Sequence, residues 1–493
     1  MDAIMQAIMA GAVTGMSKIE FLEKELEQWL TSKARRLQLT GSRYYDGDHD
    51  ILERKREVIG SSGSLEAVDN LPNNKILDNQ YAKAVDQKTN YLFAKPFTVE
   101  TENEALADVL GPYFSAKFRR QLKRVGRTSI NQGIAWLHPY YTDEGVLKFK
   151  MFEGSEVLPF WKDGEHTDLD SAIRFYTVDG YEGNKQVTIN KVEYYTKDGI
   201  ERYTYKDGKL TLDGDVEEPM TSYFTAVRDD QSIPLNWDRI PLIAFKFDDQ
   251  ETPLIKRVKA LQDALNTIAS NFMNGMEEDP RNTILVLENY DGTNLGEFRR
   301  NLAQYGAVKV RSQDGARGDV RTLTVDVNAE NYKSIYQIIK NALIENAKAL
   351  DAKSDRTGQA NEMNILSMYS EMDIDANGTE LEFQAAFEDL IYFIAVHTSN
   401  TGGGDFVDEP VDILFNRDIQ ISEADTVRIA KESMGIISHE TIVANHPWVK
   451  DKDIEMQRIK QEKEDALASY DPFRGRDIDP GDDEDGEDGE ADE

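Results

Sequence analysis

The chain has 493 residues, no cysteine and a formal net charge of −34. Its length allows several domains with sizeable cores, and the lack of cysteine excludes disulfides, thiolate metal sites and a cysteine nucleophile. An acidic surplus this large disfavours non-specific coating of nucleic acid, because the phosphate backbone would be repelled. The N-terminus carries no basic region, and no apolar run reaches about 18 residues, so we expect neither a signal peptide nor a membrane-spanning helix.

Residues 17–132 are expected to be mainly helical. Apolar spacing predicts helices over Ile19–Leu37, Asn73–Leu92, Asn103–Leu110 and Tyr113–Gln132, with a Gly/Ser-containing linker over Gly60–Leu71. The last of these helices is rich in Lys and Arg. Its basic face could meet phosphate, but we interpret it as a solvated face of an acidic protein.

A metal site is conceivable at His49, which has aspartates at positions 46, 48 and 50. Crowded acids around one histidine in a Gly-containing turn are more typical of a solvated loop. We therefore expect no metal ion there.

From Ile134 the apolar period changes to two, which predicts antiparallel β structure over residues 134–247. Asp-Gly dipeptides between the runs are typical of hairpin turns. The expected strands are Ile134–Tyr141, Val146–Phe152, Ala172–Val178, Gln186–Tyr195, Glu201–Tyr205 and Ile240–Phe247.

Two long helices are predicted next, over residues 252–278 and 329–350. Apolar side chains in the first recur at steps of four and three, which is a heptad-type seam. A mixed αβ module over residues 279–328 separates them, with strands at Thr283–Glu288, Ala307–Arg311 and Val320–Val327 and a helix at Leu295–Tyr305. On this pattern alone, the two helices would form an ordinary packed hairpin.

A polar loop over residues 351–361 connects the second long helix to a third, Glu362–Thr398. Asp373 begins a pattern that nearly matches a calcium loop, but Gln384 stands where a bidentate carboxylate is required. We expect no calcium site, and we predict a helix kink at Asn377 and Gly378.

The C-terminal part is predicted to contain short helices over residues 421–470 and a disordered acidic tail over residues 471–493. From Asp477 onward, 11 of 17 residues are acidic and none is basic.

Common catalytic and nucleotide-binding motifs are absent from the sequence. Asp248 and Asp249 could form a metal carboxylate pair, although acids are also favoured at the start of a helix. If these acids do hold a metal ion, the chain could be a metal-dependent DNA-processing enzyme that uses acidic clusters, and we keep this as the alternative function. The leading hypothesis is a protein that is not an enzyme and has no cofactor.

Five stretches, in their order and spacing, resemble portal proteins (head–tail connectors) of tailed bacteriophages of the siphophage type. They are Tyr44–Ile51 (YYDGDHDI), Asn74–Pro96, Trp237–Phe245 (WDRIPLIAF), Lys259–Asn266 (KALQDALN) and Gly435–Glu455. The resemblance covers about residues 20–470.

The resemblance implies an α+β portal-type fold. Residues 1–250 would form the wing, 252–278 and 329–350 two stem helices, and 279–328 the clip. Residues 351–361 would form the tunnel loop, 362–420 the kinked tunnel helix and its return to the wing, and 421–470 the crown.

The resemblance also implies a homo-oligomeric ring of twelve subunits at one capsid vertex, through which double-stranded DNA is packaged and ejected. The implied partners are terminase, a head–tail adaptor, scaffold and the major capsid protein, with no membrane. The implied location is the virion, with assembly in the host cytoplasm.

The resemblance assigns candidate residues to two sites. Those for the DNA channel are Lys340, Lys348, Lys353, Ser354, Asp355, Arg356, Thr357, Gln359 and Asn361. Those for clip contacts with terminase and adaptor are Arg299, Arg300, Lys309, Arg311 and Arg317. The four channel cations could equally be solvated or pair between subunits.

Overall fold

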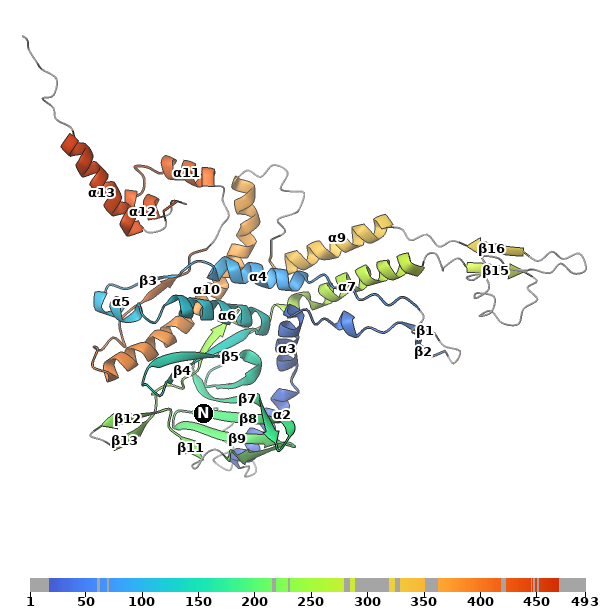
Figure 1. The fold of residues 1–493 in the computed structure, drawn as a ribbon, viewed down its shortest axis with the longest axis horizontal. Coiled ribbons are helices and arrows are strands. Elements are labelled where there is room, and N and C mark those ends of the chain that lie inside the picture. Colours follow the sequence, from blue (N-terminus) through green and yellow to red (C-terminus); the bar gives the residue numbers. More distant parts are fainter. Residues whose placement is uncertain are drawn as a thin grey trace, which may run out of the picture. The chain divides into compact units, whose positions relative to one another are not determined.

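Figure 1 shows the computed structural model of the chain. It describes residues 17–59, 63–68, 71–214, 219–228, 231–278, 284–288, 319–323, 329–350, 362–417, 423–444, 446, 448–449 and 452–469. Helices and antiparallel sheets occupy largely separate parts of the chain, which confirms the α+β class. The part of the chain that is described contains no helix long and apolar enough to cross a membrane.

Two helices stand where one was predicted over Ile19–Leu37. They are α2 (Lys18–Leu30) and α3 (Lys33–Tyr45). Ser32 has an extended backbone and its hydroxyl accepts a hydrogen bond from the Arg35 amide, so it ends one helix and caps the next. The single-helix prediction was wrong because this serine bonds the backbone locally.

A six-stranded antiparallel sheet holds most of the predicted β region. Its strands are β6 (Val157–Trp161), β7 (Leu169–Glu182), β8 (Lys185–Thr196), β9 (Gly199–Lys206), β10 (Lys209–Leu212) and β11 (Met220–Thr221). They follow the order β10-β9-β8-β7-β6, with β11 on β9. Apolar side chains of α2 cover one face of this sheet.

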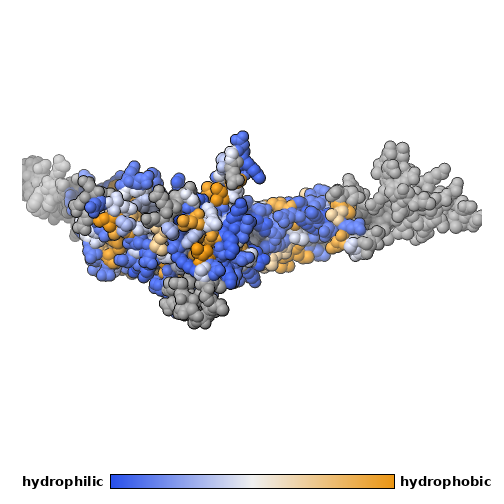
Figure 2. Space-filling view, turned by 90° about the horizontal axis from the view of Figure 1, so that it is seen from below, coloured by the Kyte–Doolittle hydropathy of each residue, from blue (hydrophilic) through white to orange (hydrophobic). Residues whose placement is uncertain are grey.

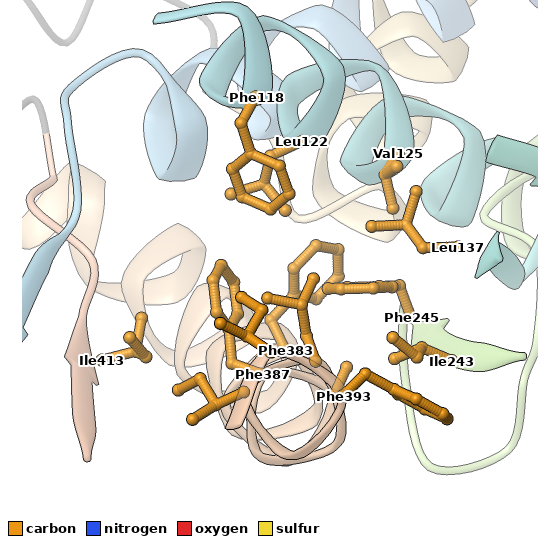
Figure 3. Packing of buried hydrophobic residues seen from close by; sticks show 14 of the residues in the cluster. Phe118, Leu122, Val125, Leu137, Ile243, Phe245, Phe383, Phe387, Phe393 and Ile413 are labelled. Carbon is orange, nitrogen blue, oxygen red and sulfur yellow. The ribbon is translucent and has the colours of Figure 1, made fainter. Parts of the chain in front are cut away.

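A three-stranded sheet forms the centre of the molecule's largest core. Its order is β14 (Ile243–Lys246), β4 (Ile134–Tyr141) and β5 (Leu147–Glu153), so β14 and β5 are its two edges. One face packs toward the six-stranded sheet through Trp136 and Phe152. The other packs on α6 (Ala116–Gln132) and α10 (Glu362–Asn400), as Figure 3 shows for Phe118 and Phe387.

Three short two-stranded pairings complete the β structure. They are β1 (Glu57–Ile59) with β2 (Leu65–Ala67), β3 (Thr98–Glu100) with β17 (Asp412–Leu414), and β12 (Phe224–Arg228) with β13 (Gln231–Leu235). Strand β2 lies inside the predicted linker Gly60–Leu71, and β1 directly precedes that linker, so the prediction was wrong for residues 65–67. The isolated helix α5 (Glu104–Leu110) agrees with its predicted range.

The two long helices are α7 (Ile255–Glu278) and α9 (Ala329–Asn346), and they pack side by side (Figure 1). The predicted end of the second helix at residue 350 was wrong. After Asn346 the chain turns at Lys348, whose φ is 48°, and it cannot continue as a helix. Between the helices, β15 (Ile284–Glu288) pairs antiparallel with β16 (Asp319–Leu323). The predicted helix Leu295–Tyr305 and strand Ala307–Arg311 lie outside the described residues.

The described residues from Glu423 onward, together with 362–365, form a separate compact unit. It contains α11 (Glu423–Glu432), α12 (His439–Ala444) and α13 (Lys452–Ser469). The predicted acidic tail, residues 471–493, lies outside the described residues.

Candidate functional site

A ladder of four polar side chains fixes α7 to an extended segment. The side chains are Gln262, Asn266, Ser270 and Asn274, each at most 1% exposed. They accept hydrogen bonds of 2.7–3.1 Å from the backbone amides of Tyr81, Asp78, Ile76 and Asn74, respectively. Four helical residues advance about 6 Å and two extended residues about 6.6 Å, so the two repeats stay in register over Asn74, Ile76 and Asp78. Tyr81 follows three residues later, in the first turn of the next helix.

This polar ladder explains why helix α4 (Gln80–Phe93) begins at Gln80 and not at Asn73. The side chains of α7 accept from the amides of Asn74, Ile76 and Asp78, and Asn79 caps α4 by accepting from the Ala82 amide. The earlier start predicted from apolar spacing was wrong, because the sequence pattern does not show that long-range partner.

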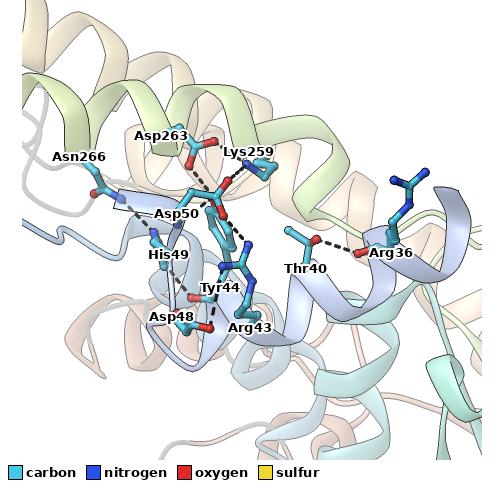
Figure 4. Close-up of polar contacts among 10 residues, drawn as sticks. All are labelled: Arg36, Thr40, Arg43, Tyr44, Asp48, His49, Asp50, Lys259, Asp263 and Asn266. Atoms are coloured by element: carbon cyan, nitrogen blue, oxygen red, sulfur yellow. Dashed lines mark hydrogen bonds and ion pairs between the residues drawn. The ribbon is translucent and has the colours of Figure 1, made fainter. Parts of the chain in front are cut away.

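His49 belongs to the same buried network and is not exposed to solvent (Figure 4). The side-chain amide of Asn266 donates to its Nδ1 at 2.9 Å, which leaves Nε2–H to donate to the Tyr44 carbonyl, also at 2.9 Å. Burial lowers the pKa of His49, which agrees with a neutral ring. The prediction of a solvated loop was therefore wrong for His49, which joins α3 to α7.

The neighbouring carboxylate of Asp50 forms ion pairs with two cations (Figure 4). Lys259 on α7 contacts it at 2.6 Å, and Arg43 on α3 also pairs with it. Burial alone would raise the pKa of Asp50, but these two cations lower it to about 2.

A buried ion-pair cluster lies where the 351–361 segment leaves the paired helices. Asp375 on α10 accepts from Lys88 of α4 at 2.6 Å and from Lys348 at 2.8 Å, and Arg257 of α7 lies 3.5 Å away. Burial would raise the pKa of Asp375, yet the surrounding cations lower it below its usual range. The cluster thus joins α4, α7, α10 and the chain just after α9.

Backbone contacts extend this anchor to the last residue before the segment. Lys88 also donates to the Lys348 carbonyl at 3.2 Å. The Gln87 side chain bonds both backbone groups of Leu350, donating at 2.9 Å and accepting at 3.3 Å. We call Gln87, Lys88, Lys348, Leu350 and Asp375 the loop anchor.

The calcium-like pattern is entirely helical and its side chains have protein partners. Besides Asp375 in the loop anchor, Asp373 accepts from the Tyr91 hydroxyl at 2.9 Å and pairs with Arg417, which also contacts Asn377 and Glu380. These contacts agree with the expectation of no calcium loop. Helix α10 is continuous through Asn377 and Gly378, so a kink at those residues stays a prediction.

The carboxylate of Asp248 has partners within the protein. Its carboxylate accepts from the Thr252 amide at 2.7 Å and pairs with Arg257 at 3.2 Å. Nowhere in the described ranges do three His, Cys, Asp or Glu side chains gather in a way that could hold a metal ion. The enzyme alternative therefore gains no support from Asp248.

The structure places two of the predicted channel residues. Lys348 is in the loop anchor, with its side chain 44% exposed, and Lys340 is half-buried on α9 without an ion pair among the described residues. Residues 353–361 and the clip candidates Arg299, Arg300, Lys309, Arg311 and Arg317 lie outside the described residues. Gln87 and Lys88 were not predicted to be functional residues. The signal for Lys88 was a charged side chain one helical turn after Ala84 and Val85, on the apolar face of the helix.

Known proteins match this chain over nearly its whole length. The family model described as phage portal protein, SPP1 Gp6-like, matches residues 22–468. A portal protein of Bacillus phage SPP1 is 29% identical over 429 residues, which cover 86% of this chain and 83% of that protein. A portal protein of Clostridium phage phiCD119 is 25% identical over 448 residues, covering 87% and 93%. The chain therefore belongs to the SPP1 Gp6-like family of phage portal proteins.

Proposed function

We propose that this chain assembles into a homo-oligomeric ring of twelve subunits at one capsid vertex, and that viral double-stranded DNA enters and leaves through its channel. Family membership supports the portal role. In this proposal residues 351–361 are the segment that meets DNA, with Lys340, Lys348, Lys353 and Arg356 forming charged collars round the ring.

The observation that carries this proposal is the loop anchor. A segment that touches moving DNA needs fixed ends, and the loop anchor ties residues 348–350 to α4 and α10 through side chains that are largely buried. The anchoring charge pair between Lys88 and Asp375 is 6% and 10% exposed, respectively. A buried ion pair of this kind adds little to the free energy of unfolding, and its main effect is to favour one arrangement of the chain segments that carry it.

The net charge of the chain also suits a conduit. Each phosphate that a protein neutralises strengthens binding in a salt-dependent way, so a channel with many cations would hold DNA rather than let it slide. At −34 per subunit, the ring would repel the backbone except at the few collars.

Ring assembly is supported by apolar side chains on the outside of the paired helices. Met273, Ile335 and Ile338 are 42%, 48% and 65% exposed, although both helices bury another face against each other. Figure 2 shows orange patches on the part of the surface formed by α7 and α9. Exposed apolar side chains on long packed helices are typical of subunit contacts.

The proposal also covers the other proteins that the ring would contact. The 279–328 module would meet terminase during packaging and the head–tail adaptor afterwards, while scaffold and major capsid protein would contact the ring at the capsid vertex. The protein would assemble in the host cytoplasm and remain in the virion.

The test is deletion of residues 351–361, joined by a short Gly/Ser linker. We expect rings with an unchanged number of subunits, because the deleted segment lies outside both helices, and loss of DNA packaging in an extract that supplies terminase and ATP. Packaging at the unmodified level by the deleted ring would contradict the proposed role of the segment.

A further inference from the structure

A basic groove of about 1670 Å³ lies between α6 and the edge strand β5. Seven Lys and Arg side chains line it, against four Asp and Glu. They include Arg120 and Arg124 on α6 and Lys148 and Lys150 on β5, all four exposed. Such a surplus of cations stands out in a chain whose net charge is −34.

The cations of the basic groove have few contacts within the subunit: Arg127 lies against Tyr45, and Lys150 lies over the Phe152 ring. Within the ranges that the structure describes, none of the seven forms an ion pair, and both α6 and β5 are described in full. Lysines on an edge strand can serve to prevent uncontrolled strand pairing, which would explain Lys148 and Lys150. That role does not explain the cations of α6.

An acidic groove of about 870 Å³ lies beside β14, between α10 and the chain around residues 161–169. Its charge balance is the reverse, with seven Asp and Glu against four Lys and Arg. Burial, partly offset by Arg239, raises the pKa of Asp389, with Glu388 and Asp168 adding to the rise. Two of the groove's carboxylates have cation partners, Asp389 with Arg239 at 2.8 Å and Asp168 with Lys162 at 2.6 Å, whereas Asp238 and Glu388 form no ion pair among the described residues.

The two grooves lie at opposite edges of one sheet. Because β4 separates β5 from β14 and no residue lines both grooves, the basic and acidic grooves are two separate surfaces of one subunit. Contacts between two different faces of the same chain generate rings when the rotation closes. Complementary charge across such contacts fixes the register and rejects wrong partners.

We infer that the basic groove docks the acidic groove of the next copy of this chain, so that the two edges of the central sheet form the contact between neighbouring subunits. The inference rests on the proposed ring and identifies the surfaces that build it. Salt bridges between Arg120 or Arg124 and carboxylates near Glu388 would lie in this interface.

The composition of the basic groove favours a protein occupant over nucleic acid. Four acids, among them Asp86 and Glu153, lie among its cations, and apolar side chains such as Val109 and Met151 line it as well. Phosphate backbones prefer a uniformly positive surface. Protein interfaces combine an apolar centre with charged surroundings.

The test reverses the charge of each groove separately and then the charges of both grooves together. The basic reversal is Arg120→Glu with Arg124→Glu, and the acidic reversal is Asp238→Lys with Glu388→Lys; all four side chains are exposed. The matched control for the basic reversal is Lys33→Glu with Arg119→Glu, two exposed cations that line neither groove. Ring content is measured by mass photometry and electron microscopy, and folding by circular dichroism.

We expect each single-groove reversal to reduce ring content at least about tenfold, since like charges facing each other cost several kcal/mol. The variant with both grooves reversed should regain rings, because the charges are again complementary, and the control should keep them. Rings that persist in both single-groove reversals, or no recovery in the combined variant with unchanged circular dichroism, would overturn the inference while leaving the ring itself intact. If the unmodified chain formed no rings, the proposed function would fail as well.

Discussion

At the scale of single residues, the carboxylate of Asp375 matters most for the loop anchor. It is shared by Lys88, Lys348 and Arg257, and removing it would leave the buried Lys88 ammonium without a counter-charge. Breaking a buried pair in this way typically costs about 3 kcal/mol.

We therefore predict that Asp375→Asn lowers the thermal unfolding midpoint by several degrees. The control is Glu371→Gln, the same chemical change at an exposed position one turn earlier on α10, which should leave the midpoint nearly unchanged. The midpoints are measured by circular dichroism at pH 7. Equal midpoints for both variants would show that the loop anchor does not depend on this charge.

A second residue-scale prediction concerns acid sensitivity at His138. Its ring is half-buried between the sheets, and this burial lowers its pKa to about 4, despite the hydrogen bond to the Pro241 carbonyl. The folded pKa thus lies below the unfolded value of about 6.5. The contribution of His138 is fully present above pH 6.5 and is lost as the pH falls toward 4.

Between pH 7 and pH 5 this loss amounts to about 2 kcal/mol. We expect the unfolding midpoint of the unmodified chain to fall over that range, and that of His138→Gln to fall less, because glutamine does not titrate. Parallel pH profiles for the two proteins would show that His138 does not become protonated during unfolding.

At the scale of elements, the polar ladder decides how α7 is held. Replacing Asn266 by leucine would leave the Asp78 amide and His49 Nδ1 without partners in a buried setting. An unsatisfied buried group costs about 1–3 kcal/mol. Asn341→Leu, on the exposed side of α9, makes the same substitution outside the ladder.

We predict that Asn266→Leu speeds hydrogen exchange of peptides covering residues 73–79, as followed by mass spectrometry. Exchange in these peptides should not change in Asn341→Leu. Unchanged exchange in both variants would mean that the segment is held by something other than the ladder.

A further prediction at this scale concerns how the loop anchor fixes the chain after α9. Gln87→Leu removes both hydrogen bonds to Leu350 but keeps the size of the side chain. We expect rings to form normally and DNA packaging to fall severalfold, because the start of the 351–361 segment is less well fixed. Gln80→Leu, in the first turn of the same helix, serves as the comparison. Equal packaging by the two variants would contradict a positioning role for Gln87.

Elements with a strong local pattern could be predicted from sequence, and those set by distant partners could not. The alternating apolar residues of β4 and β8 and the seam of α7 gave nearly correct ranges. The extended segment before α4 was missed, because its partners are nearly 200 residues away on α7. The charge cluster at Asp375 was missed for the same reason, as its four side chains come from distant parts of the sequence.

At the scale of the whole molecule, family membership and the described architecture support one account. Two helices pack together, the segment between α9 and α10 starts from a buried ionic anchor, and the central sheet carries opposite charge at its two edges. In the proposed ring, the sheet edges would build the wall and the anchored segment would meet the DNA.

The central claim is that this chain forms a closed ring with a channel wide enough for double-stranded DNA. Electron microscopy of the purified protein, with its mass measured in the same buffer, tests it most directly. The account predicts rings with a central opening and a mass near twelve times the 55.9 kDa of one chain. A stable monomer at high protein concentration, or a closed particle without an opening, would contradict it.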